Sequence, residues 1–236
     1  SAISMSTCTM PSTTRATNTG TGSIVTTGPN AYGMWATGTA SADNAGSIST
    51  SGDTSYGMLA EGHAYAANSG TIETEGDYSY GMYALNASTA LNTSNESIET
   101  WGDHAHGMVA GSESSITNTG SVTTHGDHAY GMEAFSLAIA DNSGTVTTYG
   151  EGSHGMVLDT LGIGTNSGTI TTRGEESHAA YVYDNSVFTN TGTLDSLQGN
   201  ALTALDGSTA NLLDGTVLAG SHTLSGDAAC DVSGHG

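Results

Sequence analysis

The sequence predicts an all-β fold, a parallel β-solenoid (β-helix) of about nine coils with about 24 residues per coil. Three observations lead to this prediction. A unit of about 24 residues recurs along the chain, its segments alternate like β-strands, and equivalent positions keep one residue type from copy to copy.

The repeat is marked by a glycine that holds its place in each copy. Representative copies read SIVTTGPNAYGMWA, TIETEGDYSYGMYA and TITTRGEESHAAYV, and the marker glycines are Gly28, Gly52, Gly76, Gly102, Gly126, Gly150 and Gly174. They are 24, 24, 26, 24, 24 and 24 residues apart, so one copy carries an insertion, between Met82 and Ile98. A register this regular predicts that each copy forms one coil.

Each unit is expected to contain short strands joined by turns rich in Gly and Asp. The strand before the marker glycine carries two columns: Ile24, Ile48, Ile72, Ile98, Val122, Val146, Ile170, and Thr26, Thr50, Thr74, Thr100, Thr124, Thr148, Thr172. The strand after it carries two more: Met34, Met58, Met82, Met108, Met132, Met156, and Ala36, Ala60, Ala84, Ala110, Ala134, Leu158, Val182. In a solenoid such columns become stacks of residues about 4.8 Å apart, and we expect them to form the core.

Two further columns are polar or aromatic. The first precedes the Ile column and either forms an amide ladder or simply tolerates a turn. It consists of Asn44, Asn68, Asn118, Asn142, Asn166 and Asn190. Tyr32, Tyr56, Tyr80, His106, Tyr130, His154 and His178 are expected to stack ring on ring, with His154 and His178 as pH-sensitive members.

The pattern divides the chain into three parts. Residues 1–17 are an N-terminal strand, cap or assembly segment, residues 18–192 are the regular repeats, and residues 193–236 are degenerate terminal coils with a C-terminal assembly segment. Leu194 and Val217 still fall roughly in the phase of the Ile column.

Composition excludes several classes of protein. The 236 residues include 2 Lys+Arg and 23 Asp+Glu, a formal charge of −21, and the only fixed cations are Arg15 and Arg173. A nucleic-acid binder needs a cationic footprint, so nucleic acid is not expected as a partner. No apolar run approaches the ~20 residues of a transmembrane segment. The chain is expected to be a mature, exported one.

Units of the form NSGTITTxGDxAxGM resemble the repeats of β-helical passenger domains of bacterial autotransporters and related surface adhesins. The resemblance covers roughly residues 18 to 192. It implies an extracellular location on the bacterial cell surface, a structural or adhesive role, and a host-surface or polysaccharide ligand.

No enzyme is expected, and neither catalytic residues nor an organic cofactor are assigned. The acids Asp53, Asp77, Asp103, Asp127, Glu151 and Glu175 repeat with the coil instead of clustering, and we expect no carboxylate pair outside the period. Long uniform faces are therefore expected.

Metal binding is an open alternative for these acids. Like charges about 5 Å apart repel by about 1 kcal/mol in water, so Asp53, Asp77, Glu151, Glu175 and the rest of the column are screened either by Ca²⁺ or by solvent. Asp103, His104, Asp127 and His128 lie at matching places on adjacent coils, where they form a chelating group or are ordinary surface residues.

Two surface hypotheses concern other residues. Outward pairs Ser121/Thr123, Thr145/Thr147 and Thr169/Thr171 suggest an ice-binding array, although Glu73 and Glu99 interrupt it. Three N-glycosylation sequons, at Asn86, Asn92 and Asn95, predict a surface loop in the expanded coil.

The ends of the chain suggest self-association. Cys8 and Cys230 lie near opposite ends of a rod of about 40 Å, so a disulfide between them is expected to be intermolecular and to join subunits head to tail. Two free thiols in a monomeric rod, or a bond formed by a tail that folds back, are the alternatives.

Overall fold

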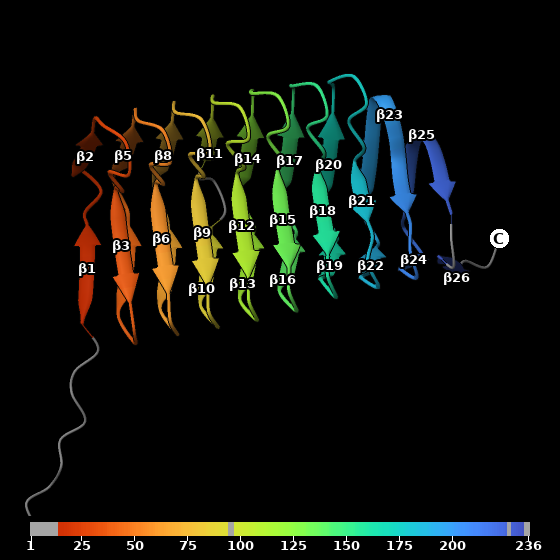
Figure 1. Ribbon diagram of the computed structural model, residues 1–236, viewed down its shortest axis with the longest axis horizontal. Coiled ribbons are helices and arrows are strands. Elements are labelled where there is room, and N and C mark those ends of the chain that lie inside the picture. Colours follow the sequence, from red (N-terminus) through yellow and green to blue (C-terminus); the bar gives the residue numbers. More distant parts are fainter. Residues whose placement is uncertain (1–13, 94–96, 226–227, 234–236) are drawn as a thin grey trace, which may run out of the picture.

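The computed structural model describes residues 14–93, 97–225 and 228–233. All regular structure in these residues is β-strand, wound into a parallel solenoid of about nine coils with about 24 residues per coil, as predicted. Figure 1 shows the strands of successive coils lying side by side along the long axis. No helix in the described ranges is long and apolar enough to cross a membrane.

Each regular coil contributes one strand to each of three faces. The Ile face comprises β2 (Ser23–Thr26), β5 (Ser47–Thr50), β8 (Thr71–Thr74), β11 (Ser97–Thr100), β14 (Ser121–Thr124), β17 (Thr145–Thr148) and β20 (Thr169–Thr172). The Met face comprises β3 (Met34–Thr37), β6 (Met58–Glu61), β9 (Met82–Leu85), β12 (Met108–Gly111), β15 (Met132–Phe135), β18 (Met156–Asp159) and β21 (Ala180–Val182).

The third, Asn face is a ten-stranded sheet. Its strands are β1 (Arg15–Asn18), β4 (Ser41–Asn44), β7 (Tyr65–Asn68), β10 (Thr89–Asn92), β13 (Ser115–Asn118), β16 (Ile139–Asn142), β19 (Ile163–Asn166), β22 (Val187–Asn190), β24 (Thr209–Leu213) and β26 (Ala229–Ser233). The long strand β23 (Thr193–Ala204) pairs with both β20 and β21 and joins the other two faces, and β25 (Val217–Leu224) pairs with β23.

Strand register confirms the predicted columns. Ile98 pairs with Ile72 and Val122, and Met108 pairs with Met82 and Met132. From the second coil onward the Ile, Thr, Met and Ala columns are buried, and the apolar ones form a single continuous core. Small and β-branched side chains suffice because the solenoid is narrow.

The marker glycine is required by the close approach of neighbouring coils. A Cβ atom built on Gly126 would lie 2.0 Å from the carbonyl oxygen of Gly102, and the same contact recurs at the equivalent glycines from Gly52 onward. Only glycine lets the two backbones lie this close.

The Asn column forms a ladder of buried amides. Each Nδ2 donates to the Oδ1 of the next asparagine at 2.7–2.9 Å, through Asn18, Asn44, Asn68, Asn92, Asn118, Asn142, Asn166 and Asn190. Of the two interpretations, the amide ladder is therefore confirmed. Asn18 and Asn92 extend it beyond the six residues predicted.

Asn92 corrects the expectation of a surface loop at all three sequons. Its side chain is fully buried in the ladder and donates to Asn118 at 2.9 Å, so it is inaccessible in the folded chain. Asn86 lies on an exposed turn, and Asn95 lies outside the described residues. The insertion falls between β10 and β11, after the ladder position, which is why it leaves the register intact.

Candidate functional site

A column of stacked rings runs along the turn that leads from the Ile face to the Met face. Ring centroids are 4.5–5.3 Å apart and adjacent planes are nearly parallel, through Tyr32, Tyr56, Tyr80, His106, Tyr130, His154 and His178. The predicted stacking is confirmed. The rings take this position because each turn has the same backbone and the same register.

The histidines of this ring column are held neutral. Nδ1 of His106, His154 and His178 accepts the backbone N–H of Tyr130, His178 and Asn200, at 2.9, 3.1 and 2.9 Å. Burial, with a smaller contribution from neighbouring histidines, lowers the pKa of His106 and of His154 to about 3. The proton of each neutral ring therefore lies on Nε2.

Outward side chains of the Met face widen this column into an aromatic strip. The outward column next to the Met column holds Trp35 on β3, Tyr83 on β9 and Tyr181 on β21. Tyr83 packs edge-to-face against Tyr56 and Tyr80, with centroids 5.3 Å apart. We call the ring column together with these three residues the aromatic strip.

The strip covers a second apolar layer outside the core. Leu59, Val109 and Val157 point away from the solenoid interior, yet they are 6%, 1% and 1% exposed. Large neighbouring side chains on the same face therefore shield them from water. Glu133 lies between Val109 and Val157 in this layer and is itself only 19% exposed.

Glu133 was missed by the sequence analysis. Its carboxylate is 3.6 Å from Nε2 of His106, and burial together with the charge of Asp159 on the next coil raises its pKa to about 7. Asp159 in turn accepts a hydrogen bond from Tyr183. Glu133 and Asp159 thus lie outside the acidic column and influence each other electrostatically, which the sequence analysis did not expect. The signal was available in the sequence for Glu133, because the other residues of its column on these strands are apolar or aromatic.

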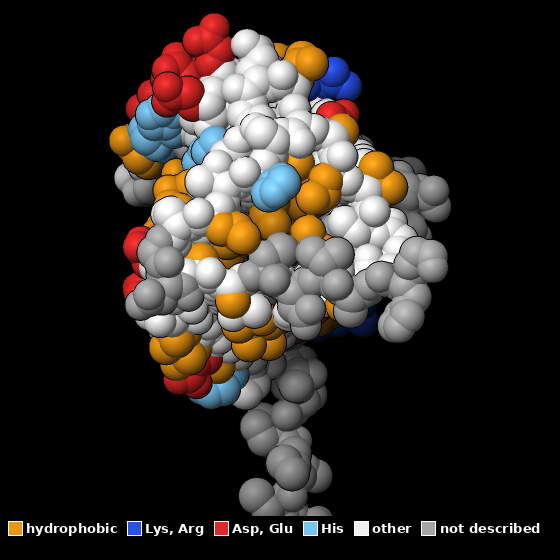
Figure 2. Space-filling model, turned by 90° about the vertical axis from the view of Figure 1, so that its right-hand side faces the viewer, with side chains coloured by type: hydrophobic (Ala, Val, Ile, Leu, Met, Phe, Trp, Pro, Cys, Tyr) orange, Lys and Arg blue, Asp and Glu red, His pale blue; other side chains and the backbone are white. Residues whose placement is uncertain are grey.

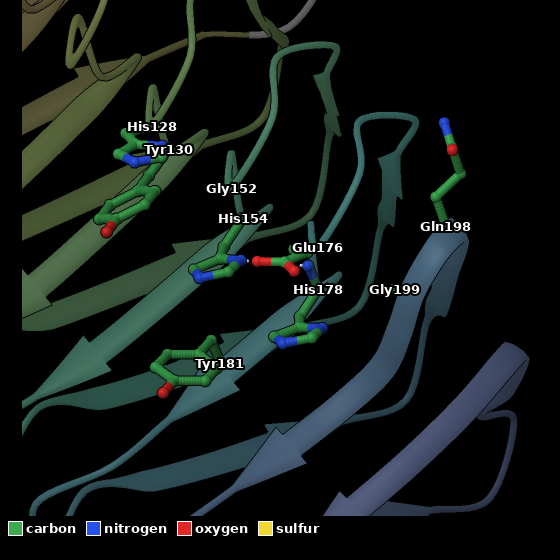
Figure 3. A pocket seen from close by; sticks show the side chains of 9 residues that line it. All are labelled: His128, Tyr130, Gly152, His154, Glu176, His178, Tyr181, Gln198 and Gly199. Atoms are coloured by element: carbon green, nitrogen blue, oxygen red, sulfur yellow. Dashed lines mark hydrogen bonds between the residues drawn. The ribbon is translucent and has the colours of Figure 1, made fainter.

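A shallow groove lies at the C-terminal part of the strip. Its volume is about 560 Å³, and Tyr130, His154, His178, Tyr181 and Gln198 are among the residues that line it. Figure 3 shows the rings of Tyr130, His154 and His178 following one another along three coils, with Tyr181 beside the two histidines. The groove offers aromatic edges, polar groups and the carboxylate of Glu176 to a ligand.

The predicted acidic column lies on the exposed turn beside the strip. Asp53, Asp77, Asp103 and Asp127 each accept, through Oδ1, the backbone N–H of the next acid in the column at 2.9–3.1 Å. The last of these donors is Glu151, and Glu175 continues the column on the following coil. Figure 2, a view along the solenoid, shows acidic side chains gathered at one corner with histidines close by.

The predicted chelating residues are neighbours but do not converge. His104 stacks on Tyr78 at 4.8 Å and meets His128 edge-on at 5.2 Å, while the carboxylates of Asp103 and Asp127 bind backbone N–H groups. Across the described part of the chain, no three His, Cys, Asp or Glu side chains are grouped so as to hold a metal ion.

The cysteine prediction remains untested by the structure. Cys8 lies outside the described residues, and Cys230 lies in β26, at the end of the ten-stranded sheet opposite β1.

Comparison with known proteins identifies one family. Its model, the BigA third pectate lyase-like domain, matches residues 3–94 and again residues 88–210. Searches of curated proteins and of solved structures give no match. The two matches follow the repeat and span most of the solenoid, so the chain belongs to the BigA third pectate lyase-like domain family, a β-helix family of bacterial surface proteins.

Proposed function

We propose that this chain is a non-enzymatic, adhesive segment of a bacterial surface protein that holds its ligand on the Met face. The observation that carries the proposal is the aromatic strip, which extends over seven coils without a break. Tyr and Trp provide large contact area at low entropic cost and are enriched in binding surfaces.

Binding is favoured over cleavage by the distribution of charge. Cleavage of an acidic polysaccharide needs cations beside the reacting group, and the chain has two. Arg15 is paired with Asp43 at 2.6 Å on the Asn face, and Arg173 follows β20 on the Ile face. Neither lies on the strip. A rod that spreads its aromatic groups along its length suits adhesion to an extended host-surface or polysaccharide ligand.

The proposal is tested with beads that carry the purified chain. We expect them to adhere to a panel of immobilised polysaccharides or to an epithelial cell layer, with no release of new reducing ends. The double variant Tyr83→Ser/Tyr181→Ser should lower retention about tenfold, since contact residues at a binding surface contribute 1 kcal/mol or more each. Tyr65→Ser, which removes an exposed tyrosine from the Asn face, is the matched control. Equal retention of both variants, or release of reducing ends, contradicts the proposal.

A second candidate function is that of a rod that associates head to tail into a filament. The alternative is an autotransporter passenger that acts as a monomer. It is supported by the sheet ends, because among the described strands β1 pairs with β4 alone and β26 with β24 alone. Light scattering and non-reducing gels distinguish the two. Oligomers that collapse on reduction support a Cys8–Cys230 linkage, and a monomer under both conditions contradicts it.

A further inference from the structure

Among the described residues, Glu133 is the only acid in its column on the Met face. The column reads Trp35, Leu59, Tyr83, Val109, Glu133, Val157 and Tyr181. In a repeat protein, a residue that departs from the pattern of its column calls for either a structural explanation within its own coil or a functional one. Burying a carboxylate between two valines costs free energy, so a structural reason is absent unless a partner compensates it.

No fixed cation faces Glu133 within the described residues. The neighbouring titratable groups are Tyr80 and His106 from the turns before β9 and β12, Tyr83 on β9, Tyr130 before β15, Asp159 on β18, and Tyr181 and Tyr183 at and after β21. His106 is neutral because its Nδ1 accepts a backbone N–H and burial lowers its pKa to about 3. The carboxylate therefore has aromatic and neutral neighbours and one further acid.

Phenol groups from several coils lie within electrostatic range of this carboxylate. Burial raises the pKa of Tyr83 to about 12, and the charges of Tyr56 and then Glu133 add to the rise. Glu133 also contributes to the raised pKa of Tyr80, Tyr130 and Tyr183, after burial. These phenols stay protonated, and each offers an oxygen acceptor, while the ring faces of Tyr80 and Tyr130 are covered by their stacked neighbours. A carboxylate among such oxygen acceptors matches the chemistry that recognises organic cations.

We propose that Glu133 and the tyrosines around it form a recognition site for the ammonium or guanidinium group of a Lys or Arg side chain on a basic polypeptide partner. The inference rests on the Met face being the binding face, as proposed above. A side chain suits the site because Glu133 is recessed in the outer apolar layer and only 19% exposed, so a charged group reaches its carboxylate best at the tip of a long, thin aliphatic stem. The formal charge of −21 attracts a basic partner over long range.

The affinity of this site depends on pH with a defined sign. Glu133 has a raised pKa of about 7, caused by burial and then by Asp159, so its charged form gains population as the pH rises through 7. Cation binding is expected to strengthen from pH 6 to pH 8, over a range in which Lys and Arg stay charged. By linkage, the bound cation lowers the pKa of Glu133.

The test is an NMR titration of the full chain with three soluble Gly/Ser peptides that carry one Lys, one Arg or one norleucine. We expect the Lys and Arg peptides to shift the signals of Tyr83, Tyr130 and Glu133, and the norleucine peptide to leave them in place. If the Lys and Arg peptides bind with unequal affinity, the tighter one identifies the preferred cation. The Glu133→Gln variant should bind about tenfold more weakly, and its affinity should no longer rise with pH. It keeps the volume of the side chain and removes a buried charge, and thermal melting checks its fold.

Glu73→Gln is the matched control, because it removes one negative charge from an exposed position on the Ile face. We expect it to change the affinity less than about twofold. Equal weakening by the two variants, binding of the norleucine peptide, or no binding at all overturns the inference. Its failure is separable from that of the proposed function: adhesion that needs Tyr83 and Tyr181 but not Glu133 leaves the adhesive role intact. Cation binding through Glu133 without adhesion contradicts that role alone.

Discussion

The three histidines of the ring column show how one position accepts two side chains of different chemistry. Tyr and His both supply a flat ring that stacks on the coils before and after. Histidine adds an acceptor, since Nδ1 of His154 receives the N–H of His178 at 3.1 Å. That bond and burial both favour the neutral ring, so the histidines make folding depend on pH where tyrosine does not.

The variant His154→Tyr tests this dependence. The pKa of His154 is lowered from its ordinary 6.5 to about 3, by burial and then by His178 and His128, so the unfolded chain binds the proton first. The contribution of the neutral ring is complete above pH 6.5 and is lost as the pH falls from 6.5 toward 3. Between pH 7.5 and pH 5 the native chain should therefore lose about 1–2 kcal/mol more stability than the variant, measured by urea unfolding. His222→Tyr, at an exposed position on β25, should behave like the native chain. An acid response unchanged in His154→Tyr would show that other groups dominate.

Single residues were predicted well where the repeat imposes them. Spacing alone is enough to stack Tyr32 on Tyr56, because coils of equal length place equal positions above one another. Glu133 could not be understood in this way. Its raised pKa depends on Val109 and Val157, which are 24 residues away in sequence and adjacent in space.

At the scale of the strands, the amide ladder is the main polar feature of the Asn face. Asn118 accepts from Asn92 and donates to Asn142, each at 2.9 Å, and its Nδ2 also approaches the carbonyl oxygen of Thr145 at 3.3 Å. Each amide from Asn44 to Asn166 therefore bonds in both directions along the stack. The ladder ties eight strands of this sheet together, from β1 to β22, where an apolar column would only pack.

Replacing Asn118 with Leu should interrupt the ladder. The change leaves the Oδ1 of Asn142 without its donor, which costs about 1–3 kcal/mol. It also removes one acceptor from the Nδ2 of Asn92, which keeps the carbonyl oxygen of Ser121 at 3.2 Å. We expect a total destabilisation of about 2–4 kcal/mol, measured by urea unfolding. Thr117→Ala, at the neighbouring outward position of β13, should cost about 0.5 kcal/mol or less. Comparable values for the two variants would show that the ladder contributes little.

The strands themselves were predictable because their residues alternate and their register repeats. The role of Asn92 was less evident, since it lies beside the insertion and also begins a sequon. Only the register of β10 with β7 and β13 shows that it belongs to the ladder.

On the scale of the whole molecule, the formal charge of −21 opposes the compact state. The sequence left two ways to relieve this repulsion, bound Ca²⁺ or solvent. The structure adds a third, because four aspartates of the acidic column each accept a backbone N–H from the next coil. These bonds give each of the four carboxylates a hydrogen-bond donor on the next coil.

Screening by mobile ions and screening by bound Ca²⁺ respond differently to salt and to a chelator. If backbone N–H groups and mobile ions screen the column, raising NaCl from about 10 mM to about 300 mM should raise the melting temperature by a few degrees. A chelator at matched ionic strength should then leave it unchanged. The double variant Asp103→Asn/Asp127→Asn keeps an oxygen to accept each N–H but removes two charges from the middle of the column, so its salt response should be smaller. A chelator that lowers the melting temperature, with recovery on addition of Ca²⁺, would instead establish bound cations along the acidic corner.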